Sequence, residues 1–152
     1  MKRQILLLED DYELGETLKE LLESHDYEVD LVENGNSAID SSYDKSYDLY
    51  IFDINVPDIN GLDLLKSLRE ADDKTPAIFI SALVDLNSIT KGFEVGADDY
   101  IKKPFFPQEL LIRVNAKFTQ INREILFKNL RYVPESKDFS IDEKIVSLGE
   151  VQ

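Results

Sequence analysis

The chain has 152 residues, of which 43% are hydrophobic, and this length suits one main domain with at most a small addition. Its net charge of −14 argues against non-specific binding of nucleic acid, and the absence of cysteine excludes disulfides, thiolate metal sites and a cysteine nucleophile. The acidity belongs to the first 121 residues, because residues 122–152 hold five basic and six acidic side chains. There is no signal peptide and no stretch of about 20 apolar residues, so we expect a soluble, cytoplasmic protein.

Five short apolar segments recur along the chain and predict β-strands. They are ILLL from Ile5, VDLV from Val29, LYIF from Leu49, AIFI from Ala77 and YI from Tyr100. Helical patterns separate or follow them near residues 12–24, 37–43, 61–68, 87–95 and 107–118. Strands that alternate with helices predict an α/β fold, a doubly wound five-stranded parallel sheet with helices on both faces.

The pattern changes near Thr119. Residues 128–152 contain short segments with β character, separated by the turns ESK and DEK, and they are too few to bury a core alone. We therefore expect a main domain of residues 1–120, a linker of residues 121–127 and a short C-terminal antiparallel β fragment of residues 128–152.

Polar groups stand at the carboxyl ends of four predicted strands. Glu9 and Asp10 follow the first strand, Asp53 ends the third, Ser81 ends the fourth, and Lys103 follows the fifth. In a doubly wound sheet the loops at these ends converge, so we expect these side chains to gather at one edge. A single acidic strand end is an ordinary feature of a polar loop, but functional groups at four strand ends favour a site.

Carboxylates that lie close together repel one another unless a cation lies among them. Oxygen ligands with no histidine or cysteine nearby favour a hard ion, and we expect Mg²⁺ as the cofactor. This set can accept a phosphoryl group: Asp53 would be the nucleophile, Mg²⁺ and Lys103 would offset charge on the phosphoryl oxygens, and Ser81 would donate a hydrogen bond.

Four stretches resemble the receiver domain of two-component response regulators of the OmpR/PhoB type. They are ILLLEDD, YIFDINVPDINGLDLLKSLR, AIFISAL and GFEVGADDYIKKPFFPQELLIRV, and together they span residues 1 to about 120. The resemblance implies a CheY-like (flavodoxin-like) fold, a sensor histidine kinase as phosphoryl donor and a cis peptide between Lys103 and Pro104. It also implies a phosphoacceptor switch that catalyses its own phosphoryl transfer, and not an enzyme.

The resemblance assigns the metal and phosphoacceptor residues position by position. It implies that Glu9 and Asp10 hold Mg²⁺, with Asp10 the direct ligand. Asp53 is then the phosphoacceptor and also a metal ligand, and the backbone carbonyl of Asn55 completes the metal shell.

The same comparison implies the residues that respond to phosphorylation. Ser81 and Lys103 contact the phosphoryl group, and Tyr100 is the rotating aromatic side chain that reports phosphorylation to the surface. Leu83 stands at a position that borders the attacking water in receivers, and its apolar side chain predicts slow autodephosphorylation.

A dimerisation face is also implied, on the fourth helix, fifth strand and fifth helix. Ile89 and Asn115 stand where family members often carry basic residues, so we expect fewer ion pairs and a weakened homodimer. The residues that match this dimer face are Phe93, Asp98, Asp99, Glu109, Leu111 and Arg113.

The C-terminal residues resemble the N-terminal antiparallel sheet of an OmpR-type winged-helix effector. In that family a recognition helix follows such a sheet, and it is absent before Gln152. We therefore expect DNA binding only through an effector part outside this chain, no specific DNA binding by the chain itself, and no membrane association.

Two other interpretations stay open. A haloacid-dehalogenase-type phosphatase also uses an aspartate after a strand with Mg²⁺, but it needs a second aspartate two residues later, where this chain has Asn55, and a cap domain is not evident. The other is a receiver that acts through protein contacts only or that works unphosphorylated. The C-terminal residues favour a DNA-binding output, and the intact set of Asp10, Asp53, Ser81 and Lys103 argues against phosphate-independence.

Overall fold

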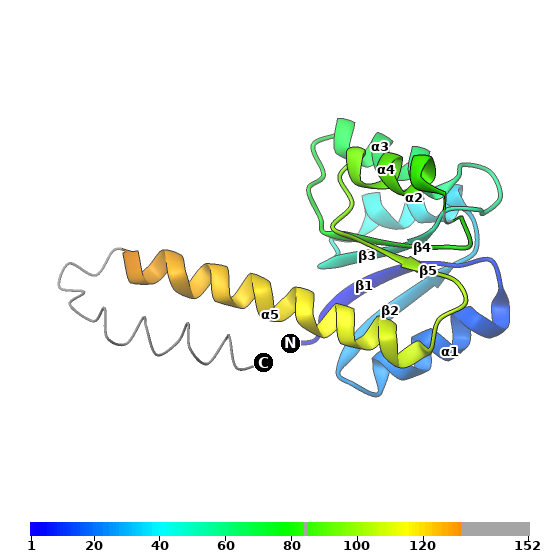
Figure 1. Cartoon of the computed structure of the whole chain (residues 1–152). Coiled ribbons are helices and arrows are strands. Elements are labelled where there is room, and N and C mark those ends of the chain that lie inside the picture. The colour runs from blue at the N-terminus through cyan, green and yellow to red at the C-terminus, as the bar shows by residue number, and fades with distance from the viewer. Residues whose placement is uncertain (84, 132–152) are drawn as a thin grey trace. The chain divides into compact units, whose positions relative to one another are not determined.

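A five-stranded parallel sheet forms the centre of the protein (Figure 1). The computed structural model describes residues 1–83 and 85–131. The strands are β1 (Arg3–Leu8), β2 (Tyr27–Val32), β3 (Leu49–Asp53), β4 (Ala77–Ser81) and β5 (Asp99–Lys102). Their order is β2-β1-β3-β4-β5 and every neighbouring pair is parallel, which confirms the predicted α/β fold.

Helices connect the strands and cover both faces of the sheet. They are α1 (Tyr12–Glu23), α2 (Gly35–Asp44), α3 (Gly61–Glu70), α4 (Leu86–Glu94) and α5 (Pro107–Arg131). Figure 1 shows α2, α3 and α4 on one face, with α1 and the first turn of α5 on the other. The sheet, the first four helices and this first turn make up one compact unit, Met1–Leu111. Within the described residues, no helix combines the length and apolar character that a membrane crossing requires.

The central strands β1, β3 and β4 are buried on both sides. The side chains of residues 5–8 have no exposed surface, and every residue of β3 and β4 is buried. Because helices lie on both faces, these strands require apolar residues at consecutive positions instead of alternate ones. The runs ILLL, LYIF and AIFI are the result, and the polar residue after each run marks the place where the sheet reaches its edge.

Four helices begin in the same way at the carboxyl edge of the sheet. Each has an aspartate or asparagine N-cap whose side chain accepts a hydrogen bond from a backbone N–H in the first turn, which satisfies a donor that the helix itself leaves unpaired. The N-caps are Asp11, Asn34, Asn60 and Asp85. These caps fix the loops between strands and helices, which are the loops that carry the candidate site.

The last helix is longer than the sequence pattern predicted. The pattern predicts a helix that ends at Phe118 and a linker over residues 121–127, but α5 continues to Arg131. Residues 119–131 contain neither glycine nor proline, so nothing in them interrupts the helix. The predicted linker and residues 128–131 of the predicted β fragment are therefore helical, and residues 132–152 lie outside the described part of the chain.

A polar network closes the sheet edge opposite the candidate site. Tyr50 is 1% exposed, and its hydroxyl donates a hydrogen bond of 2.5 Å to Asp73, in the turn between α3 and β4. The Asp73 carboxylate also accepts bonds from the backbone N–H and the hydroxyl of Thr75, at 3.0 and 2.7 Å. Burial raises the pKa of Asp73, but the hydrogen bonds from Thr75 and Tyr50 outweigh it and hold the pKa below its usual range.

Replacing Asp73 is expected to destabilise the fold. Asp73→Ala removes an acceptor from the buried Tyr50 hydroxyl and should lower the free energy of unfolding by about 1–3 kcal/mol. Urea denaturation followed by circular dichroism measures this change. Glu70→Ala, at an exposed position in the last turn of α3, is the control and should stay within about 0.5 kcal/mol of the wild type. Equal losses in the two variants would contradict the role of the network.

Candidate functional site

Strand order and register bring the predicted site residues to one edge of the sheet. β3 lies between β1 and β4, and Leu8 pairs with Phe52, so the next residue on each strand, Glu9 and Asp53, become neighbours. In the same way Ser81 pairs with Lys102, and Lys103 follows. Parallel pairing therefore places the groups at the ends of four strands at one edge of the sheet, as the sequence predicted.

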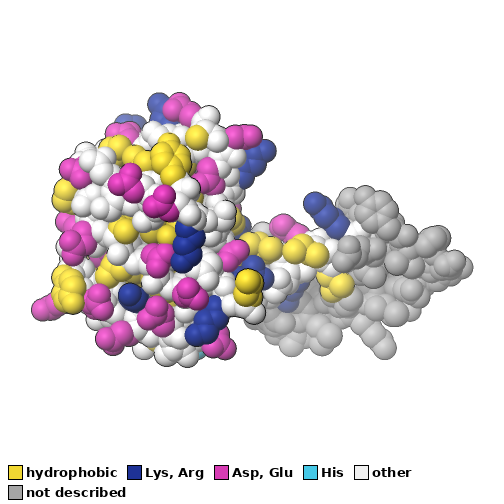
Figure 2. All heavy atoms as spheres, turned by 180° about the vertical axis from the view of Figure 1, so that it is seen from behind, with side chains coloured by type: hydrophobic (Ala, Val, Ile, Leu, Met, Phe, Trp, Pro, Cys, Tyr) yellow, Lys and Arg dark blue, Asp and Glu magenta, His cyan; other side chains and the backbone are white. Residues whose placement is uncertain are grey.

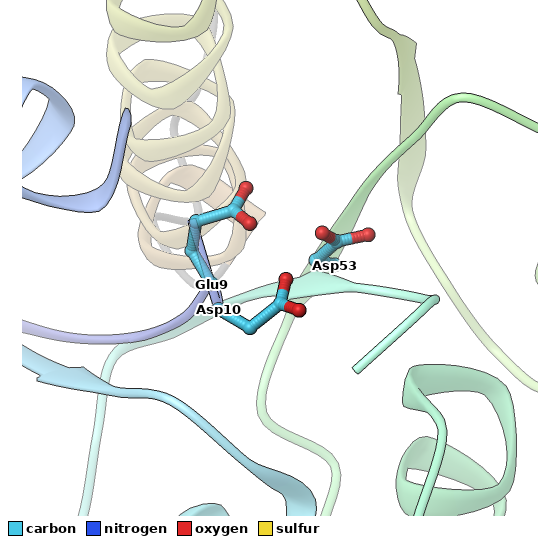
Figure 3. A group of neighbouring side chains, drawn as sticks. All are labelled: Glu9, Asp10 and Asp53. Atoms are coloured by element: carbon cyan, nitrogen blue, oxygen red, sulfur yellow. The ribbon is translucent and has the colours of Figure 1, made fainter. Parts of the chain in front are cut away.

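Three carboxyl groups face a common space at this edge. Glu9, Asp10 and Asp53 each offer one oxygen, and these oxygens lie within 4.8 Å of one another (Figure 3). Glu9 is 1% exposed and Asp53 is 4% exposed, whereas Asp10 is open to solvent. Two buried acids and one accessible acid thus form a cluster of carboxyl groups that solvent reaches at Asp10.

One ammonium group lies between the two buried acids. The Nζ atom of Lys103 is 2.8 Å from Oε1 of Glu9 and 2.8 Å from Oδ2 of Asp53. The bond to Asp53 is a hydrogen-bonded ion pair, but among the described residues Oε1 of Glu9 has no hydrogen-bond partner, so its contact with Lys103 is ionic only. Backbone groups hold the other oxygens: Glu9 accepts from the N–H of Asp11, at 3.1 Å, and Asp53 from that of Asn55, at 3.2 Å.

The surroundings of Glu9 and Lys103 shift the pKa values of both groups. Burial raises the pKa of Glu9 to about 7, with a further contribution from the charge of Asp53, while the contacts with Lys103 and the Asp11 N–H act in the opposite direction. Burial alone would lower the pKa of Lys103, but its hydrogen bond to Asp53 and its ionic contact with Glu9 outweigh this effect and raise the pKa. One ammonium thus faces three carboxyl groups, and a second cation would be stabilised here.

The donor set fits a hard divalent ion. The cluster offers carboxylate oxygens only, one of them a buried oxygen without a hydrogen-bond partner among the described residues, and this is the ligand type that Mg²⁺ prefers. Glu9, Asp10 and Asp53 could therefore hold a metal ion, as predicted. The N–H of Asn55 bonds to Asp53, and the role of the Asn55 carbonyl as a ligand stays a prediction.

The polar residues of β4 and β5 are joined through the backbone of Leu83. Ser81 is fully buried, and its hydroxyl oxygen accepts a bond of 3.0 Å from the Leu83 N–H. The hydroxyl of Tyr100 donates a bond of 2.7 Å to the Leu83 carbonyl, and burial raises the pKa of this tyrosine. The Tyr100 ring packs edge-on against Phe79, 6.2 Å between ring centres. Sequence reasoning named Ser81 and Tyr100 but missed Leu83 as the link, because a backbone contact leaves no signal in side-chain type.

A cis peptide follows Lys103. The bond between Lys103 and Pro104 is cis, as the resemblance implied, and the Lys103 N–H donates to the Ser81 carbonyl at 2.8 Å.

One residue of the predicted dimer face is buried within the chain, and others are exposed. Leu111 is buried, 9% exposed, because it belongs to the apolar side of α5 together with Leu110, and its place on the dimer face stays a prediction. Phe93 is 48% exposed and Ile112 67% exposed, and both present apolar surface to solvent.

The charged residues of that face have mixed surroundings. Asp98 is exposed, yet its carboxylate accepts a bond of 2.9 Å from the N–H of Ala77 and so caps the start of β4. Asp99 accepts from the N–H of Tyr100. Glu109 and Arg113 are half-buried. Acidic side chains are spread over the face of the molecule seen in Figure 2, with some basic ones among them.

The family model for the response regulator receiver domain matches residues 5–115. The chain belongs to this family. The match covers the strand ends that carry the acidic cluster and Lys103. This result removes the support for a haloacid-dehalogenase-type phosphatase, whose second aspartate was already missing at Asn55.

Curated relatives are transcriptional regulatory proteins. The chain is 33% identical over 151 residues to the transcriptional regulatory protein RprY of Bacteroides fragilis, an alignment that covers 99% of the chain and 64% of RprY. It is 36% identical over 145 residues to CusR of Escherichia coli, with 95% of the chain and 60% of CusR covered. The chain thus spans less than two thirds of the length of these relatives.

Solved structures of receiver domains resemble the chain closely. The receiver domain of a Francisella response regulator has a TM-score of 0.75 at 31% identity, with 79% of this chain and 99% of that domain covered. The response regulator DrrB of Thermotoga maritima, an OmpR/PhoB homologue, has a TM-score of 0.73 at 29% identity, with 79% of this chain and 54% of DrrB covered. These likenesses confirm the CheY-like fold of a receiver domain.

The raised pKa of Glu9 predicts how metal-free stability depends on pH. The folded-state pKa of about 7 lies above the usual 4.5, so the stability that the protonated form provides is present below about pH 4.5 and is lost as the pH rises to about 7. The glutamine in Glu9→Gln stays neutral at every pH, so this variant should keep the stability that the wild type loses. Between pH 4.5 and pH 8 its free energy of unfolding should rise relative to that of the wild type by up to about 3 kcal/mol.

Urea unfolding in the presence of EDTA at several pH values measures this gain. Glu28→Gln, an exposed position in β2, is the control and should follow the wild type at every pH. Parallel curves for Glu9→Gln and the wild type would contradict the shifted pKa.

Proposed function

We propose that the chain is the receiver part of a cytoplasmic response regulator in which Asp53 accepts a phosphoryl group from a phosphohistidine of a sensor histidine kinase. The observation that carries this proposal is the position of Asp53: it is buried at the end of a central strand, between the acids Glu9 and Asp10 and the ammonium of Lys103. Membership of the receiver family supports it, since phosphoryl transfer is the chemistry that this arrangement suits.

The chemistry is a phosphoryl transfer between two nucleophiles. A carboxylate oxygen of Asp53 forms the new P–O bond while the P–N bond to the donor histidine breaks and its electron pair stays on the imidazole. Lys103 and the Ser81 hydroxyl would bind the phosphoryl oxygens and orient them for in-line attack. Mg²⁺, held by Glu9, Asp10, Asp53 and the carbonyl of Asn55, would offset the negative charge of those oxygens. The chain thus catalyses its own modification and does not turn over a substrate.

The backbone of Leu83 offers a route from the phosphoryl group to the surface. Its N–H bonds to Ser81 and its carbonyl to Tyr100, so a Ser81 hydroxyl that turns toward a phosphoryl group would release the turn on which Tyr100 depends. A rearranged Tyr100 would alter the neighbouring dimer face. The transcriptional regulatory relatives support DNA binding, through an effector domain, as the output of the whole protein.

A receiver that works without phosphorylation remains the second candidate. The intact cluster of Glu9, Asp10, Asp53 and Lys103 disfavours it, because a phosphate-independent regulator does not need to stabilise buried acids with a single ammonium.

Incubation with Mg²⁺ and acetyl phosphate or phosphoramidate is expected to add one phosphoryl group, which intact-mass spectrometry detects. Asp53→Asn should abolish the gain, because it removes the nucleophile. Asp58→Asn is the matched control: Asp58 is exposed on the loop that follows β3, and asparagine tolerates its positive φ of 73°. No gain in the wild type, or an equal gain in Asp53→Asn, would count against the proposal.

After removal of the phosphoryl donor, the apolar side chain of Leu83 predicts that the aspartyl phosphate has a half-life of many minutes. A half-life of seconds would contradict the predicted slow autodephosphorylation.

Beryllofluoride, an analogue of the phosphoryl group, is expected to promote a homodimer that size-exclusion chromatography resolves. Phe93→Ser removes exposed apolar surface from α4 and should weaken the dimer about tenfold or more. Tyr43→Ser is the control, because Tyr43 is an exposed aromatic residue, 75% exposed, on α2 and away from that face. An unchanged elution volume of the wild type with beryllofluoride, or equal effects of the two substitutions, would contradict a dimer through this face.

A further inference from the structure

Two Asn-Gly pairs begin the helices next to the loop that carries the site. Asn34 caps α2 and Asn60 caps α3, and in each case the glycine that follows is the first helical residue and is buried. The loop in question, residues 54–60, leads from the phosphoacceptor Asp53 to α3 and is called the β3–α3 loop below. Each of the two glycines contacts this loop or the strand end before it.

Gly61 holds the near end of the β3–α3 loop. Its N–H donates to the Ile54 carbonyl at 2.9 Å, and a Cβ atom at this position would lie 2.4 Å from the carbonyl oxygen of Asp53. This contact closes the loop onto its own strand, and it is local, because Gly61 is the next residue after the loop.

Gly35 reaches the middle of the same loop from another helix. Its N–H donates to the Pro57 carbonyl at 3.1 Å. A Cβ atom on Gly35 would lie 2.3 Å from the carbonyl oxygen of Ile59 and 3.0 Å from its backbone nitrogen. These are backbone atoms, which cannot turn aside as a side chain can, so only glycine allows α2 to approach the loop this closely.

The side chains of Ile54, Val56 and Ile59 pack in or against the core, but the backbone of the β3–α3 loop has few hydrogen bonds to other elements. Asn55, Pro57 and Asp58 are exposed, and Asp58 has a positive φ of 73°. The remaining backbone hydrogen bonds of this loop, all between described residues, run within the loop, to Asp53 or to the start of α3. The bond from Gly35 is therefore the one that ties the middle of the loop to a separate element, α2.

We infer that Gly35 is a positioning residue for the phosphoacceptor site: the first turn of α2 braces the β3–α3 loop and thereby fixes the backbone around Asp53 and Asn55. The inference rests on the proposed function for the meaning of the site, and it adds α2 to the elements that determine the site's geometry. A brace of this kind acts on metal affinity, because outer groups that orient ligands typically change affinity about 10- to 100-fold when they are removed.

Gly35→Ala tests the brace, and Gly15→Ala is the matched control. Both glycines are buried helical residues, but a Cβ atom on Gly15 would meet only the flexible side chain of Leu31, at 3.0 Å. Two-dimensional NMR of each full chain gives the backbone amide shifts without metal, and titration with Mg²⁺ alone gives the dissociation constant. Circular dichroism establishes that each variant is folded.

Gly35→Ala is expected to shift the amides of residues 55–60 in the metal-free protein and to weaken Mg²⁺ binding about tenfold. Gly15→Ala should leave the shifts of these amides unchanged and the dissociation constant for Mg²⁺ within about twofold of the wild-type value. A folded Gly35→Ala with unchanged loop amides and an unchanged dissociation constant would overturn the inference. If the wild type binds no Mg²⁺, the proposed function fails instead, and the metal-free amide shifts still decide whether the brace exists.

Asn34→Ala keeps the test decisive if Gly35→Ala does not fold. It removes the cap bond of 2.8 Å to the Ser37 N–H without adding an atom next to the loop. Loosening of the first turn of α2 should then shift the same loop amides and weaken Mg²⁺ binding a few-fold. A folded Asn34→Ala that matches the wild type in both measurements would overturn the inference.

Discussion

Two buried carboxyl groups lie beside each other at the end of the central strands, and one ammonium group lies between them. Glu9 and Asp53 are almost fully removed from solvent, and Lys103 is 2.8 Å from an oxygen of each. Burial without a partner would cost several kcal/mol for each charge, so the site depends on this lysine and on the backbone N–H groups that hold the other oxygens. The balance is incomplete, as the raised pKa of Glu9 indicates, and an incomplete balance is what makes binding of a further cation favourable.

The sheet makes this arrangement possible because its central strands are rigid and end at one edge. β1, β3 and β4 are packed on both faces, so the residue that ends each run has little freedom of position. By contrast α4, all of whose residues are described, has a single buried residue, Gly92. A Cβ atom there would lie 3.2 Å from the rings of both Phe79 and Tyr100, so the glycine lets this helix rest directly on the aromatic pair. A firm site next to a loosely packed helix suits a switch, since small changes at the site can move the helix at little cost.

Glycine has a second use on the opposite side of the site. Gly35 and Gly61 let the first turns of two neighbouring helices approach the backbone of one loop. The site is thus supported by hydrogen bonds to backbone carbonyls, which constrain position without demanding a particular side chain in the loop.

The sequence by itself determined the fold and the members of the site. Apolar runs long enough for strands, separated by helical patterns, permit a doubly wound parallel sheet, and that topology brings Glu9, Asp53, Ser81 and Lys103 to one edge whatever the details of packing. Only the tertiary structure decided which groups touch: that Lys103 bridges both acids, that Leu83 joins Ser81 to Tyr100, that Leu111 is buried, and that α5 passes through the expected linker. The local sequence pattern determines which residues end a strand. Contacts between backbone atoms that are far apart in the chain depend instead on how the elements pack. Such contacts do not restrict the residue type, except where only a glycine fits.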